Sequence, residues 1–179
     1  DRLIDAILAN MRAKGYYGLD IDFEYLGEEN RDAYTAFLGK LTQRLNAEGY
    51  PVIAALAPKT DDEQPGDLYQ GHDYAGIAAA VNFVLLMTYE WGYAYGPPMA
   101  VSPLNKVREV LDYAVTKMDP SQIFLGIPNY AYDWTLPFVK GESKARALSN
   151  VQAVEQAVAR NAAISFDPVA QAPYYTYFD

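Results

Sequence analysis

Hydrophobic residues follow two different spacings along the chain. In some segments they recur every three or four positions, which predicts amphipathic helices. These helices are expected at residues 1–14, about 29–48, about 73–80, about 103–118 and about 150–160. Short apolar runs, or strict alternation of apolar and acidic residues, predict strands between them. The strands are expected at residues 18–25, 51–57, 83–89 and 123–130, with two shorter ones within 164–178 around Asp167-Pro168.

The order of these elements predicts an α/β fold. Helices that alternate with nearly continuous apolar strands are typical of βαβ units and parallel sheets. A doubly wound sheet and a (β/α)8 barrel both fit this order, but no strand is followed by a Gly-rich phosphate loop. A whole barrel takes about 250 residues, whereas the chain has 179. We therefore expect one domain over residues 1–179 that forms part of a TIM barrel.

Composition excludes several classes of partner and site. The 14 basic and 23 acidic residues give a formal net charge of −9, which argues against nucleic acid as a partner. No apolar run is long enough to span a bilayer. The chain has no cysteine and a single histidine, His72, so Cys-based and His-rich metal sites are excluded. His72 precedes a predicted helix and is expected at the surface. The 16 tyrosines suit half-wet surfaces, among them the faces of sugar rings.

The strand predicted at residues 18–25 carries the strongest chemical signal. Asp20, Asp22 and Glu24 alternate with Leu19, Ile21, Phe23 and Tyr25, so all three carboxylates are expected on one face. In an open sheet this acidic face would be an ordinary solvent-exposed face. Inside a barrel, however, the apolar side chains pack on the helices and the carboxylates crowd together, which raises at least one pKa. Glu24, nearest the carboxyl end of the strand, is then the best proton donor.

Three ordered motifs resemble those of a known family. Tyr17 to Tyr25 (YGLDIDFEY) is similar to the DGxDxDxE signature on the fourth strand of family 18 glycoside hydrolases, which include chitinases. Met87-Thr88-Tyr89-Glu90 resembles the sixth-strand MxYD, and Gly126 to Tyr130 (GIPNY) resembles the seventh-strand GxPxY. The stretches MTYEWGYAYGPP and GIPNYAYDWTL look most like the spore cortex-lytic N-acetylglucosaminidases, which are often fused to LysM modules.

The resemblance implies a function and a set of roles. It implies a retaining glycosidase that cleaves β-linked N-acetylglucosamine in peptidoglycan or chitin-like polymers, outside the cell or in the spore envelope. Family 18 is among the substrate-assisted exceptions to the two-carboxylate mechanism. By resemblance the catalytic residues are Glu24, Asp22 and Tyr89, and no cofactor or metal is required. The expected substrate-binding residues are Asp20, Met87, Glu90, Asn129 and Tyr130.

The chain departs from the family pattern in places. Tyr17 replaces the first Asp of the signature, Glu90 replaces the usual Asp, and Ala131 stands where Gly is common. The resemblance covers about strands 4 to 7 of the barrel and the start of a small insertion at 163–179. Because the eighth strand would supply the Trp under the central sugar, we expect the isolated chain to be inactive. Four strands of a barrel also leave two edges unpaired, so we expect the isolated chain to aggregate or self-associate.

Two other functions remain open at this stage. A non-catalytic carbohydrate-binding relative would keep the aromatic residues and lose the acid, but Glu24 is present. A metal-dependent hydrolase could use Asp20, Asp22 and Glu24 around Mg²⁺ or Ca²⁺. Trp91 and Trp134 could stack on sugar rings, although such residues more often anchor their own loops, and Asn129 could cap a turn.

Overall fold

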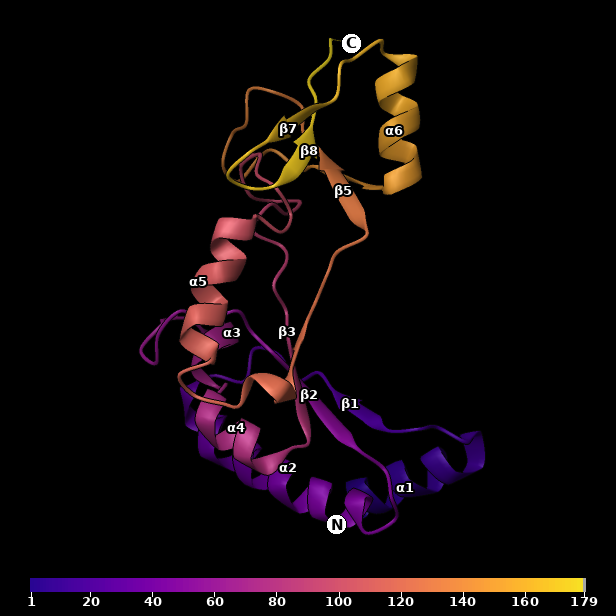
Figure 1. The fold of residues 1–179 in the computed structure, drawn as a ribbon, viewed down its shortest axis with the longest axis vertical. Coiled ribbons are helices and arrows are strands. Elements are labelled where there is room, and N and C mark those ends of the chain that lie inside the picture. Colours follow the sequence, from indigo (N-terminus) through magenta and orange to yellow (C-terminus); the bar gives the residue numbers. More distant parts are fainter. Residues whose placement is uncertain (179) are drawn as a thin grey trace. The chain divides into compact units, whose positions relative to one another are not determined.

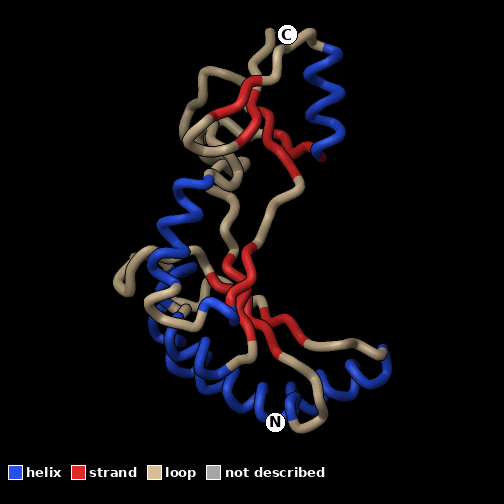
Figure 2. The backbone as a smooth tube through the Cα atoms, in the orientation of Figure 1, coloured by secondary structure: helices blue, strands red, loops and turns tan. Residues whose placement is uncertain are grey.

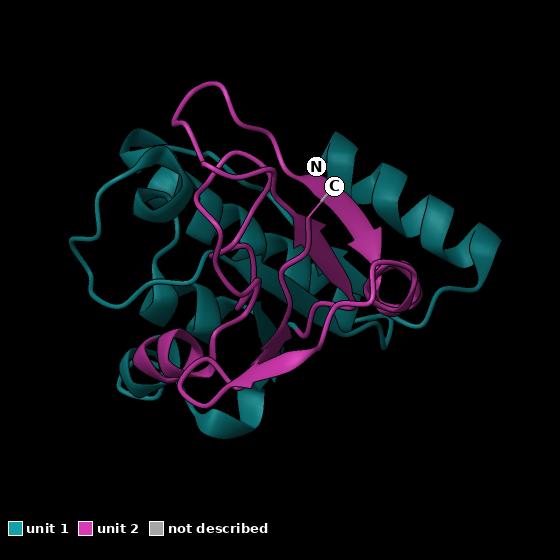
Figure 3. Cartoon of the chain, turned by 90° about the horizontal axis from the view of Figure 1, so that it is seen from above, with its two compact units in different colours: residues 1–87, 110–126 teal, residues 88–109, 127–179 magenta. Residues whose placement is uncertain are grey.

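A computed structural model describes residues 1–178, and these residues form two compact units. Unit 1 comprises Asp1–Met87 and Val110–Gly126, and unit 2 comprises Thr88–Glu109 and Ile127–Asp179. Figure 3 draws unit 1 in teal and unit 2 in magenta. The two units are described separately below.

Unit 1 holds a parallel sheet of four strands in sequence order. The strands are β1 (Leu19–Ile21), β2 (Val52–Leu56), β3 (Phe83–Leu86) and β4 (Ile123–Leu125), and each pairs with the next. They are the short red segments in unit 1 of Figure 2. A doubly wound sheet reverses its order at a switch point, whereas a barrel sheet does not. Among the described strands, the order therefore favours the barrel.

Helices of unit 1 cover one face of this sheet. They are α1 (Arg2–Lys14), α2 (Arg31–Asn46), α4 (Tyr74–Ala80) and the end of α5 (Leu104–Ala114), whereas the short α3 (Asp67–Gln70) has no buried residue and lies in the loop after β2. Figure 1 shows α1, α2 and α4 along the same side of the strands. Gly15 ends α1 in a left-handed conformation, with φ of 67°, which glycine adopts without strain. The fully buried residues between helices and sheet include Leu38, Leu41, Leu45, Val52, Leu56, Val84 and Leu86.

The other face of the sheet is open in unit 1. The strand register places Asp20, Ile53 and Phe83 in one row across it, and Ala55, Leu85 and Phe124 in the next. Phe83 is 36% exposed and Phe124 is 51% exposed. In a barrel this face points to the interior, where apolar side chains normally fill the space.

Unit 2 contains two antiparallel strand pairs and a helix. β5 (Tyr130–Asp133) pairs with β6 (Arg146–Ser149), and β7 (Ser165–Asp167) pairs with β8 (Ala172–Tyr174). α6 (Asn150–Ala159) begins after Ser149, whose side chain accepts a hydrogen bond from the backbone N–H of Gln152. The two short strands predicted around Asp167-Pro168 are confirmed as β7 and β8, whereas β6 was not predicted.

Several predicted strands are longer than the observed ones. The first was predicted to run to Tyr25 but ends at Ile21, and the third was predicted to run to Tyr89 but ends at Leu86. The run predicted from Ile123 to Tyr130 divides, because β4 ends at Leu125 and Tyr130 begins β5. In each case the pattern of apolar residues continues beyond the last residue that pairs with a neighbouring strand. Apolar alternation alone therefore does not mark where a strand ends.

Candidate active site

The acidic row begins inside β1 and continues beyond it. Asp20 lies in the strand, on the open face of the sheet, whereas its neighbour Ile21 is buried on the helix side and 5% exposed. Asp22 and Glu24 follow the strand. The expectation that one strand carries all three carboxylates is therefore wrong: the ladder to β2 ends at the pairing of Ile21 with Ala54. Beyond Ile21, contacts of Phe23 with α2 and with His72 hold the backbone instead of strand pairing.

Two carboxylates of this segment, those of Asp20 and Glu24, have raised pKa values. Partial burial is the largest cause of the raised pKa of Glu24, followed by the negative charge of Asp22 and a hydrogen bond to it. The pKa of Asp20 is also raised, first by partial burial and then by the charge of Asp22. Crowding thus acts in the direction that the sequence pattern predicts. A glutamic acid of raised pKa can hold a proton to donate at higher pH than an ordinary one.

Phe23 anchors the backbone between Asp22 and Glu24. Its ring stacks on two side chains of α2, with centroid distances of 5.8 Å to Tyr34 and 6.1 Å to Phe37. The expectation that Phe23 packs on a helix is therefore confirmed. Tyr25, which was expected on the same face, is 70% exposed and has a left-handed φ of 54°. The chain thus turns away from the strand direction directly after Glu24.

His72 lies behind this segment and is fully buried, so the expectation of a surface position is wrong. One ring nitrogen is 2.9 Å from the carbonyl oxygen of Phe23, and the other accepts a hydrogen bond of 2.9 Å from the backbone N–H of Ala57. These contacts satisfy the polar edge of the ring inside the core. Burial is the largest cause of the lowered pKa of His72.

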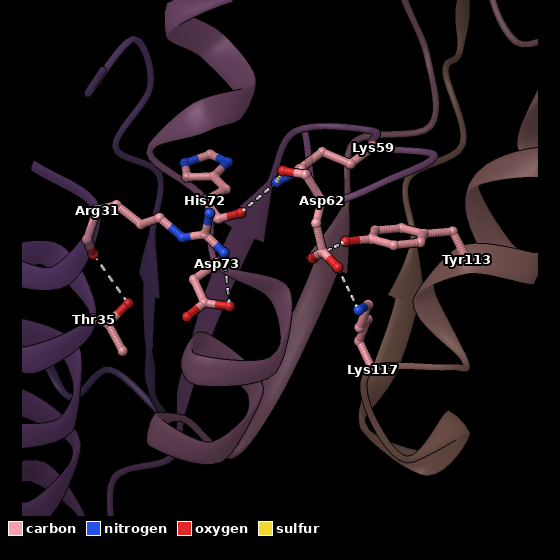
Figure 4. Close-up of polar contacts among 8 residues, drawn as sticks. All are labelled: Arg31, Thr35, Lys59, Asp62, His72, Asp73, Tyr113 and Lys117. Atoms are coloured by element: carbon pink, nitrogen blue, oxygen red, sulfur yellow. Dashed lines mark hydrogen bonds and ion pairs between the residues drawn. The ribbon is translucent and has the colours of Figure 1, made fainter. Parts of the chain in front are cut away.

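A network of charged groups fastens the loop between β2 and α4 (Figure 4). The buried Lys59 donates from Nζ to the backbone carbonyls of Asp62 and His72, each at 3.2 Å. The Asp62 carboxylate accepts hydrogen bonds of 2.5 Å from the hydroxyl of Tyr113 and from the ammonium of Lys117. The pKa of Asp62 is lowered, first by Lys117 and then by Tyr113. This network holds the carbonyl side of His72 in place.

In unit 2, two tyrosines hold Glu90. Its Oε1 atom accepts hydrogen bonds of 2.9 Å from the hydroxyl of Tyr130 and 2.7 Å from that of Tyr132. Glu90 has a left-handed φ of 67°, which is uncommon for a residue with a side chain. Burial, followed by the hydrogen bond to Glu90, raises the pKa of Tyr132 to about 12. The sequence pattern indicated Glu90 and Tyr130 but not Tyr132. Tyr132 lies two residues after Tyr130 in β5, so the two side chains share one face of the strand, and this spacing could have indicated it.

The remaining selected residues lie at the ends of β3 and β4. Met87 is 7% exposed, and its backbone N–H donates to the carbonyl of Leu56 at 3.0 Å. Tyr89 is half-buried and Asn129 is exposed, and both belong to unit 2. Trp134 donates from Nε1 to the carbonyl of Gly96 at 2.8 Å, so its indole N–H anchors a loop.

The described residues contain neither a metal-ligand cluster nor a membrane-spanning helix. Among residues 1–178, no group of three or more His, Cys, Asp or Glu side chains is arranged to hold a metal ion. No helix among these residues is both long enough and apolar enough to cross a membrane.

The whole sequence matches one family model. That model is described as Glycosyl hydrolases family 18, and the match covers residues 1–179. The chain belongs to glycosyl hydrolase family 18. The family resemblance inferred from the three motifs is thus confirmed.

Two named relatives of this family 18 chain come from Bacillus subtilis (strain 168). It is 46% identical over 178 residues to the cortical fragment-lytic enzyme of Bacillus subtilis (strain 168). It is 36% identical over 177 residues to the putative sporulation-specific glycosylase YdhD of the same organism. Each alignment covers 99% of this chain and 41% of the relative, so the chain spans less than half the length of these proteins.

Solved structures of this family 18 group share the fold. The Bacillus cereus spore cortex-lytic enzyme SleL is 43% identical with a TM-score of 0.93, over 98% of this chain and 40% of that one. The Bacillus subtilis YdhD structure also gives a TM-score of 0.93, at 36% identity, over 99% of this chain and 58% of that one. A chitinase from Chromobacterium violaceum ATCC 12472, 22% identical, has the same fold with a TM-score of 0.89 over 97% of this chain and 53% of that one. The predicted fold class, part of a (β/α)8 barrel, is confirmed.

Proposed function

We propose that the protein is a retaining glycoside hydrolase that cleaves β-linked N-acetylglucosamine in peptidoglycan of the spore cortex or in chitin-like polymers. The observation that carries this proposal is Glu24, an acid of raised pKa beside Asp22 at the carboxyl end of β1, in a chain of family 18. Active sites of (β/α)8 barrels lie at that end of the strands. The names of the cortical fragment-lytic and spore cortex-lytic relatives support a peptidoglycan substrate at the spore envelope.

The proposed reaction uses the substrate's own acetamido group. Glu24 donates its proton to the leaving glycosidic oxygen while the acetamido oxygen attacks the anomeric carbon, which gives an oxazolinium ion. Asp22 orients the acetamido N–H and stabilises the positive charge that develops there, and Asp20 supports Asp22. Glu24, now a carboxylate, then removes a proton from the incoming water as the water oxygen bonds to the anomeric carbon. The bond from that carbon to the acetamido oxygen breaks, so the oxazolinium ring opens and the anomeric configuration is retained. No second carboxylate is needed as nucleophile, in agreement with the substrate-assisted exceptions among retaining glycosidases.

Met87 of unit 1 and several residues of unit 2 have proposed roles in substrate binding. Tyr89 donates a hydrogen bond to the acetamido oxygen, while Met87 lines the sugar site. Glu90 uses Oε1 for Tyr130 and Tyr132, which leaves its Oε2 atom to accept from a sugar hydroxyl. Asn129 hydrogen-bonds a hydroxyl or an acetamido group.

Substitution of Glu24 tests the proposal. The full-length protein is incubated with N-acetylglucosamine oligomers or with spore peptidoglycan, and new reducing ends are measured. Glu24→Gln keeps the size of the side chain but has no proton to donate, so kcat is expected to fall by about 10² to 10⁴-fold with little change in KM. A variant that hydrolyses either polymer at the wild-type rate would refute the assignment.

A further inference from the structure

His72 is a fully buried ionisable ring beside the acidic segment, and the proposed mechanism gives it no role. Its two ring nitrogens contact two different strand ends. The first contact is the carbonyl of Phe23, which directly precedes Glu24, and the second is the backbone N–H of Ala57, just after β2. The ring therefore links the segment that carries the proposed acid to the neighbouring strand.

These contacts determine the tautomer of the imidazole. A backbone N–H can only donate, so the Nδ1 atom facing Ala57 must present its lone pair. The proton of the neutral ring is then on Nε2, where it is donated to the Phe23 carbonyl. A second proton on Nδ1 would meet the Ala57 N–H directly, so the site accepts only the neutral form.

The surroundings of the ring also favour the neutral form. Lys59 donates to the backbone carbonyl of His72, and its positive charge lowers the pKa of the ring, while the negative charge of Asp22 has a smaller, opposite effect. From α2, the Tyr34 ring lies 5.9 Å from the imidazole, centroid to centroid. Figure 4 shows Lys59 reaching His72 from the loop after β2. The imidazole is thus held from its backbone and on both nitrogens.

We propose that His72 is a positioning residue, which fixes the Phe23 carbonyl and through it the backbone from which Glu24 projects. This inference rests on the proposed function, because it assigns His72 a role in the reaction of Glu24. Reacting groups tolerate little displacement: a misplacement of about 1 Å can cost about 100-fold in rate. The contacts proposed for Met87, Tyr89, Glu90 and Asn129 with the sugar do not involve this backbone, so we expect the larger effect on kcat rather than on KM.

Two amide variants separate the contacts of the ring. In His72→Gln the amide group reaches the position of Nε2 and can donate to the Phe23 carbonyl. In His72→Asn the shorter amide reaches only the position of Nδ1 and can accept from the Ala57 N–H. Tyr74→Phe is the matched control, since the Tyr74 hydroxyl bonds the Ala57 carbonyl and the Lys59 N–H but not Phe23.

The experiment measures kcat, KM and the melting temperature of each full-length variant on an N-acetylglucosamine oligomer, with Glu24→Gln alongside. We expect His72→Asn to lower kcat by about 10 to 100-fold with KM nearly unchanged, while His72→Gln and Tyr74→Phe stay within about threefold of wild type. Equal loss of kcat in a folded Gln variant, or higher kcat in Asn than in Gln, would overturn the positioning role. If Glu24→Gln retains wild-type kcat, the proposed function itself fails, and this role fails with it.

Discussion

The hydroxyl of Tyr74 provides a stability test of the loop that holds Lys59 and His72. Tyr74 is the first residue of α4 and is fully buried. Its hydroxyl donates to the Ala57 carbonyl at 2.6 Å and accepts from the Lys59 N–H at 3.0 Å. Tyr74→Phe removes both hydrogen bonds and keeps the ring, including its contact with Tyr113 at 5.3 Å between centroids. The change is therefore confined to two polar contacts.

The size of the effect follows from the burial of the two partners. Ala57 and Lys59 are both 0% exposed, so water does not replace the lost hydroxyl. A buried donor or acceptor left without a partner costs about 1–3 kcal/mol. With the lower half of that range for each group, the free energy of unfolding is expected to fall by roughly 2–4 kcal/mol.

Equilibrium urea unfolding of the full-length protein measures this change. The midpoint is expected to fall while the slope m stays constant, because the area exposed on unfolding is the same. Tyr17→Phe is the control, since Tyr17 is 88% exposed and surface changes usually stay within about 0.5 kcal/mol. A loss of less than about 0.5 kcal/mol in Tyr74→Phe would show that these two bonds do not hold the loop.

Two further predictions concern the chemistry of Glu24. The charge of Asp22 raises the pKa of Glu24, so Asp22→Asn should lower that pKa. Because the reaction needs protonated Glu24, the alkaline limb of kcat against pH should move to lower pH; an unmoved limb, or one at higher pH, would contradict the coupling. Substrate-assisted attack also requires the acetamido group, so an oligomer with a 2-hydroxyl in its place should not be hydrolysed. Comparable turnover of that analogue would mean that Asp22 attacks directly.

The sequence predicts the fold of unit 1 well because the pattern and the packing agree there. Helix α1 and strand β2 fall within the expected ranges, since one side of each meets the same core. β1 was predicted too long because the alternation through Tyr25 continues after the ladder to β2 has ended. Strand length is decided by the partner strand, which a local pattern does not reveal.

The candidate site was predicted in part. The acidic row follows from spacing, and the raised pKa values of Asp20 and Glu24 follow from partial burial and then from the charge of Asp22. The position of His72 could not be predicted, because a histidine before a helix has the same local pattern whether it is exposed or bonded inside the core. Tyr132 was missed because its role depends on Glu90, which lies far from it in sequence.

The most direct test of the account compares the kcat of Glu24→Gln with that of Glu29→Gln. Glu29 is an exposed carboxylate five residues further on, in the short 3-10 helix Glu28–Asn30, and no part of the proposed reaction uses it. Both variants replace a carboxyl group by an amide of nearly the same size, so a general effect of that exchange acts on them alike. The account predicts that Glu24→Gln loses about 10² to 10⁴-fold in kcat, while Glu29→Gln stays close to wild type. Equal turnover by the two variants would contradict the assignment of Glu24 as the acid.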